Sequence, residues 1–180
     1  MIVALLLPAW ALHRSGRSWG DAGLRLPDRS ALWPTLAGIG ICLPFGIYLS
    51  RVVPDPWGTP LKEGIELVLV IPEHLLIFGV FSAWLMPAGR LAKPAGRFAL
   101  GREQFFVILA TALIFGLVHI GVESKLVLLA SFPLGLINAY VTLRTGSIWP
   151  AILAHWTMNV VPMAWDMLSG RWLLAAAALP

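Results

Sequence analysis

The chain has 180 residues, of which 58% are hydrophobic and only 12% are charged. Soluble domains average about 25% charged residues, so this composition excludes a typical water-soluble domain and favours an integral membrane protein. The net charge of +4 comes from basic residues in short loops between apolar runs, and it therefore indicates no nucleic-acid partner.

The apolar runs of the chain are long enough to cross a lipid bilayer as helices. The first run, 1–12, reaches only about 18 Å, so we expect a short first helix or a chain whose true start lies upstream. Five longer runs meet the requirement of roughly 17–25 residues for a span; they are 31–50, 67–89, 104–122, 126–143 and 148–165. We predict one integral membrane domain over 1–180, an all-α polytopic bundle of five to six spanning helices.

The distribution of basic residues predicts the orientation of this bundle. Nine Lys and Arg residues lie in the loops 13–30, 88–103 and 144–147, whereas four lie on the opposite side. By the positive-inside rule the loops with nine are cytoplasmic, and we expect the protein in the cytoplasmic membrane of a bacterium.

Polar side chains interrupt three of the long runs. Glu73 lies in the second, His119 lies near the end of the third, and His155 and Asn159 lie in the last. A charged side chain costs roughly 2.5–3.5 kcal/mol at the centre of a membrane helix, so such residues usually face the bundle interior and have a function. His155 and Asn159 are four residues apart and share one helix face. A carboxylate, two imidazoles and a carboxamide are the groups needed to activate a water and stabilise an oxyanion.

Three further polar residues are candidates for supporting roles. His74 points about 100° away from Glu73 around the helix, so the sequence leaves open whether its imidazole reaches the same site. Glu66 lies two turns before Glu73 on the same face, near the outer interface. Asn138, in the fourth long run, either packs between helices or lines the site.

The order of these motifs resembles the CPBP intramembrane proteases, the family of the CAAX prenyl endopeptidases and of bacteriocin-processing or immunity proteins. The family motifs are EExxxR, FxxxH and HxxxN. Here they correspond to Glu73, to FGLVH ending at His119, and to HWTMN from His155 to Asn159. The resemblance covers about 65–165, a protease-like core.

The first motif departs from the family pattern. His74 replaces the second glutamate, and Phe78 occupies the position of the arginine. The resemblance assigns the catalytic role to the first glutamate, which is Glu73 here, so we expect the chemistry to survive. The ion pair that the arginine would provide is absent from the helix that carries Glu73.

The resemblance implies an intramembrane endopeptidase that hydrolyses a peptide bond of a membrane-anchored or lipidated protein or peptide. Glu73 is the expected general base toward water, and His119 orients that water. His155 and Asn159 are the expected hydrogen-bond donors to the oxyanion. This mechanism requires no cofactor and no metal, and its partners are the substrate and the lipid bilayer.

Two alternatives stay open. In a zinc-dependent version of the same protease, Glu73, His119 and His155 supply three ligands and a water takes the fourth position, although the chain has no HExxH motif. In the other, the chain is a non-catalytic membrane scaffold or immunity protein with the same fold, which the altered first motif favours.

Overall fold

The computed structural model describes residues 2–52, 60–87, 101–119 and 125–169. In chain order, the elements are α1 (Ile2–Arg14), the 3-10 helix η1 (Arg29–Ala31), α2 (Leu32–Val52), α3 (Pro60–His74), the π-helix η2 (Leu75–Phe81), α4 (Ser82–Leu85), α5 (Arg102–Val118), α6 (Lys125–Thr145) and α7 (Trp149–Leu168). These ranges contain helices and no strand, which confirms the predicted all-α class.

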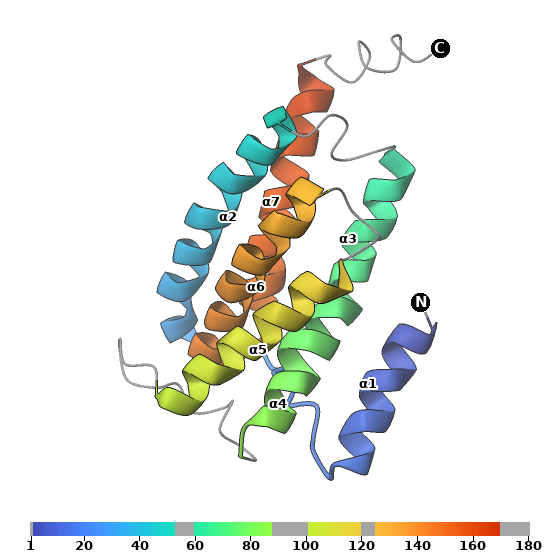
Figure 1. Cartoon of the computed structure of the whole chain (residues 1–180), viewed down its shortest axis with the longest axis vertical. Helices are drawn as coiled ribbons and strands as arrows, with labels where there is room; N and C mark the ends of the chain where they lie inside the picture. The colour runs from blue at the N-terminus through green and yellow to red at the C-terminus, as the bar shows by residue number, and fades with distance from the viewer. Residues whose placement is uncertain (1, 53–59, 88–100, 120–124, 170–180) are drawn as a thin grey trace.

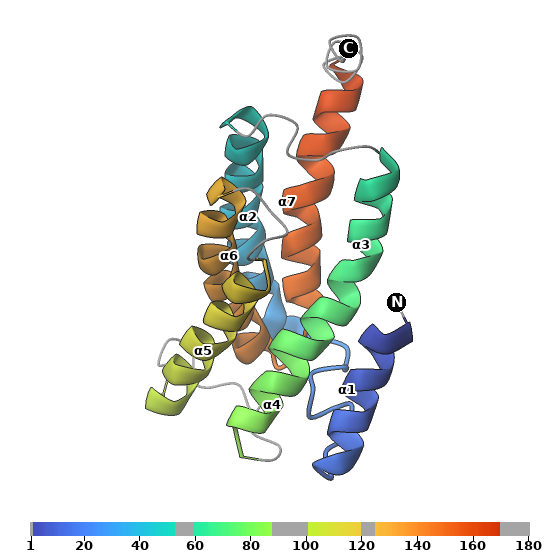
Figure 2. The same cartoon turned by 45° about the vertical axis from the view of Figure 1, so that its right-hand side comes forward.

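The helices form one bundle in which α7 contacts three neighbours (Figures 1 and 2). Helix α2 packs along α7 on one side and α3 contacts it on another, while α6 lies between α7 and α5. Helix α1 packs beside α3 and η2. The arrangement places α3, the end of α5 and the middle of α7 around the same part of the interior.

Small residues allow the helices to approach closely. A Cβ built on Gly46 of α2 would clash with the Met158 carbonyl oxygen of α7, and one on Gly135 of α6 would lie 2.9 Å from the Ala112 Cα of α5. Side chains at these positions would force the helices apart. Such small-residue contacts are typical of helix packing in membranes, where burial from water does not drive association.

The outer surface of the bundle is apolar, and it includes the exposed side chains of Trp33, Trp165 and Leu113. Within the described residues, two helices have the length and hydropathy of a membrane span, Arg29–Leu49 and Leu67–Leu85. The predicted number of five to six spans stays a prediction. The last residues of the predicted runs 67–89 and 104–122 lie outside the described ranges.

The helix that carries Glu73 is longer than predicted and changes its geometry. It begins at Pro60, continues as α3 through His74, and then follows a π-helical path through η2 before α4 ends at Leu85. Pro72 lacks the N–H that would bond to the carbonyl one turn earlier. The π-helix starts three residues after this proline, directly beyond Glu73 and His74, and π-helical turns occur frequently at functional sites.

Candidate functional site

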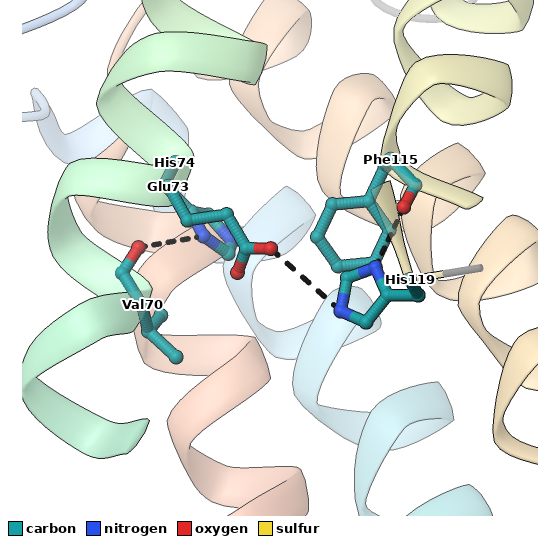
Figure 3. Close-up of polar contacts among 5 residues, drawn as sticks. All are labelled: Val70, Glu73, His74, Phe115 and His119. Carbon is teal, nitrogen blue, oxygen red and sulfur yellow. Dashed lines mark hydrogen bonds and ion pairs between the residues drawn. The ribbon is translucent and has the colours of Figure 1, made fainter. Parts of the chain in front are cut away.

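Glu73 and His119 face each other between α3 and the end of α5 (Figure 3). The His119 Nε2 atom lies 3.7 Å from the Glu73 Oε1 atom, and the two side chains are 21% and 25% exposed. His119 Nδ1 lies 2.7 Å from the Phe115 carbonyl oxygen. Because a carbonyl only accepts, Nδ1 carries the hydrogen, and in the neutral ring Nε2 presents its lone pair toward Glu73.

His74 also reaches this site, which answers the question that the sequence left open. Its side chain is fully buried, and its Nδ1 donates to the Val70 carbonyl oxygen at 3.0 Å. Its ring centroid lies 5.1 Å from that of His155. The Glu73 carboxylate faces His119, whereas the His74 ring bonds to the Val70 carbonyl oxygen (Figure 3), and both side chains lie at the site because α3 has neighbouring helices on more than one side.

Helix α7 carries His155, whose ring lies beside His74, and Asn159; the two residues are 6% and 9% exposed. Asn159 follows His155 by one helical turn on the same face. Beside His155, Trp156 donates from Nε1 to the Leu67 carbonyl oxygen of α3 at 2.9 Å. This bond joins α7 to the helix that carries Glu73. Trp156 could not be recognised from the sequence, since a tryptophan in an apolar run gives no sign of a partner 89 positions away.

Phe115 forms an aromatic wall that the histidines share. Its ring centroid lies 4.7 Å from that of His119, 6.0 Å from that of His155 and 5.3 Å from that of Phe78. Both phenylalanines are fully buried, so Phe78 fills with packing the place where the family motif has an arginine. Phe115 is the first residue of the FxxxH motif, and its side chain packs against the imidazoles of His119 and His155.

Several buried polar atoms around the site have no hydrogen-bond partner among the described residues. They are His74 Nε2, His155 Nδ1 and both amide atoms of Asn138. The Asn138 carboxamide, on α6, lies beside His74 but outside hydrogen-bond geometry. Buried polar groups are usually paired, so unpaired ones mark a place where a water, an ion or a substrate binds. The Glu66 side chain lies outside the described part of the structure.

The residues that could ligate a metal are Glu73, His74 and His155. One ligand atom from each lies within 4.8 Å of the other two. This group differs from the set expected from the sequence, which included His119 in place of His74. His119 contacts the Glu73 carboxylate separately, at 3.7 Å.

One protein-family model matches the chain over residues 67–161, more than half of its length. Its description is type II CAAX prenyl endopeptidase Rce1-like. The matched range includes Glu73, His119, His155 and Asn159. No curated protein and no solved structure matches the chain.

Proposed function

Since the chain belongs to the type II CAAX prenyl endopeptidase Rce1-like family, which is membrane-embedded, we propose that it is an intramembrane endopeptidase with Glu73 as its general base. It hydrolyses a peptide bond of a membrane-anchored or lipidated protein or peptide. The observation that carries this proposal is the arrangement of the Glu73 carboxylate opposite Nε2 of His119.

The pair has the geometry to hold and activate one water. A water about 2.8 Å from both atoms would lie to one side of the 3.7 Å line that joins them. It would donate one hydrogen to Glu73 Oε1 and the other to His119 Nε2, so its lone pairs would point at a substrate carbonyl. Glu73 then takes the proton as the water attacks, and general-base catalysis of this kind contributes about 10²–10⁴ in rate.

His155 and Asn159 supply hydrogen-bond donors from one face of α7. We assign to them the stabilisation of the negative oxygen that forms when water attacks the carbonyl. Removal of one such donor typically lowers the rate by about 10²–10³. Replacement of Asn159 by Ala is therefore expected to lower the rate of cleavage by this factor, measured as turnover per folded molecule.

Comparison of protein termini in cell membranes tests the function even while the substrate is unidentified. The comparison uses membranes from four kinds of cell: those that produce the wild-type chain, those that lack it, those that produce Glu73→Gln and those that produce Glu103→Gln. Glu103 lies in the first turn of α5, so its variant is a matched change outside the site. New termini should appear with the wild type and with Glu103→Gln, and they should be lost with Glu73→Gln.

The same experiment separates the two alternatives from the proposal. If no terminus depends on the chain, or if Glu73→Gln behaves as the wild type, the non-catalytic scaffold or immunity protein is the better description. The zinc-dependent protease requires that a strong chelator abolish cleavage and that zinc restore it. We expect cleavage to persist after chelation, because the carboxylate and imidazole already act as base and water-positioning group.

A further inference from the structure

We propose that Glu73, His74 and His155 bind one divalent transition-metal ion of the zinc class, and that the bound ion inhibits the peptidase. The inhibition rests on the function proposed above, whereas the binding of the ion does not. Both depend on His74, which stands where the family motif has a second glutamate.

The three side chains have the donor atoms of a metal site, and the spacing of those atoms is close to that of a bound zinc ion. Zinc sites use imidazole nitrogens at about 2.0–2.1 Å and carboxylate oxygens at about 2.0–2.2 Å, so tetrahedral ligand atoms lie about 3.4 Å apart. Here the ligand atoms lie within 4.8 Å of one another. The largest of these distances exceeds the tetrahedral spacing by at most about 1.4 Å, which a small rearrangement of side chains can close. The Glu73 side chain has room to move, because it is partly exposed while the two imidazoles are buried.

The hydrogen bonding of His74 prepares its imidazole as a ligand. Nδ1 donates to the Val70 carbonyl oxygen, which fixes the tautomer and leaves a lone pair on Nε2. Metal-bound histidines almost always donate a hydrogen bond from the other ring nitrogen in this way. Nε2 itself is buried without a partner among the described residues, and so is Nδ1 of His155. A bound ion would satisfy buried groups that otherwise lack an interaction.

The donor chemistry selects the class of ion. Two imidazoles and one carboxylate suit zinc, and by the usual order of stability Cu²⁺ would bind at least as tightly. Magnesium and calcium prefer sites made of oxygen ligands, so they should not compete. A fourth ligand is available as water at the partly exposed side of Glu73, where His119 also lies.

Inhibition follows from the residues that the ion engages. One oxygen of the Glu73 carboxylate would be bound to the metal, whose positive charge makes the carboxylate a weaker base toward the attacking water. His155 would coordinate the ion and could no longer donate a hydrogen bond to the developing oxyanion. The ion would also draw Glu73 away from His119, which breaks up the pair that holds the water.

Zinc titration of the purified full-length protein in detergent tests the binding. The protein is first stripped with a chelator, and heat is measured as zinc chloride is added. We expect one equivalent to bind the wild type and His13→Gln equally, since His13 is an exposed histidine in the last turn of α1. His74→Gln should weaken the dissociation constant at least tenfold. The absence of saturable binding, or wild-type affinity in His74→Gln, would overturn the proposal.

Two further measurements keep this test decisive if His74→Gln does not fold. His155→Gln should weaken zinc binding by the same factor. Cobalt(II) bound to the wild type should show the intense visible absorption of a four- or five-coordinate site. A weak spectrum typical of six oxygen ligands would contradict the assignment.

Cleavage measured against free zinc tests the inhibition. Wild-type cleavage should fall with a midpoint near the measured dissociation constant, and a chelator should restore it. In His74→Gln, half-inhibition relative to the metal-free rate of the same variant should require at least ten times more zinc than in the wild type. Stimulation of the wild type by zinc would overturn the inhibitory role and favour a catalytic metal. Failure of the metal-free wild type to cleave a verified substrate would instead overturn the proposed function, while the binding result would stand.

Discussion

Two groups of buried polar side chains in the described part of the bundle differ in their hydrogen bonding. The first is the turn between α6 and α7, residues 145–147. There, Thr145 donates from its hydroxyl to the Val141 carbonyl oxygen at 2.8 Å and accepts from the Ser147 N–H at 3.2 Å. Ser147 Oγ donates to the Arg25 carbonyl oxygen at 2.7 Å, and Arg25 Nε donates back to the Gly146 carbonyl oxygen at 2.7 Å.

The second group is the candidate site, where several polar atoms lack such partners. His74 Nε2, His155 Nδ1 and the Asn138 carboxamide are buried without a hydrogen bond among the described residues. A satisfied network stabilises one conformation, whereas an unsatisfied one keeps its binding capacity for another molecule. The comparison indicates that the turn holds the fold together and that the site is kept ready for water, substrate or ion.

The strongest test of this contrast between a structural turn and a functional site is Glu73→Gln. We expect it to lower the cleavage rate by about 10²–10⁴, because the general base is lost while the shape of the side chain is kept. The free energy of unfolding in detergent should change little. His74→Ala should lower cleavage far less, since His74 does not take the proton in this mechanism. If both folded variants were equally inactive, His74 would belong to the catalytic set.

Packing holds the site in position, and Phe78→Ala tests that contribution. Phe78 is fully buried beside His74 and Phe115, so its removal should lower the free energy of unfolding by about 3–5 kcal/mol, the range for soluble cores. Denaturant titration in micelles measures the loss, with Phe105→Ala as the control at an exposed position. Equal stability of the two variants would show that Phe78 does not brace the helix of Glu73.

Ser147→Ala tests the satisfied group of side chains. It removes the donor to the Arg25 carbonyl oxygen and should lower the free energy of unfolding by about 1–3 kcal/mol. The rate of cleavage per folded molecule should be unchanged. Ser169→Ala, at an exposed position after α7, provides the matched control. If Ser147→Ala folded normally but cleaved slowly, the turn would contribute to the site, and the contrast between a structural turn and a functional site would be wrong.

Asn138→Leu should have a small effect on stability, opposite in sign to that of Ser147→Ala. It replaces a buried carboxamide whose amide atoms have no partner among the described residues by an apolar group of similar size. The free energy of unfolding should stay the same or rise by up to about 1 kcal/mol. Thermal unfolding of the two proteins side by side measures this. A clear loss of stability would show that the carboxamide is bonded in the folded protein, and a loss of cleavage alone would place Asn138 in the site.

Much of this architecture could be predicted from the sequence because membrane helices have strong local signals. The apolar runs predicted the all-α class. The cost of burying Glu73, His119, His155 and Asn159 predicted that they would face one interior site, and the structure brings Glu73 close to both histidines. The position of His74 could not be predicted, because a helical wheel gives the angle between neighbouring residues but not how far the site extends around the helix. The hydrogen bonds of Arg25 at the turn could not be predicted either, since their partners are separated by 121 and 122 residues in the sequence.

The π-helix directly after His74 has a consequence for the register of the whole rod. Its hydrogen bonds span one residue more than those of an α-helix, so the segments on either side are offset relative to a continuous α-helix. One residue corresponds to about 100° of rotation. Gly79, within this segment, is pressed against the loop after α1, where a Cβ would lie 2.5 Å from the Ala22 carbonyl oxygen. The length of η2 thus sets how the turn that carries Glu73 is rotated relative to α4, and deletion of a single residue from η2 would change that angle by about 100°.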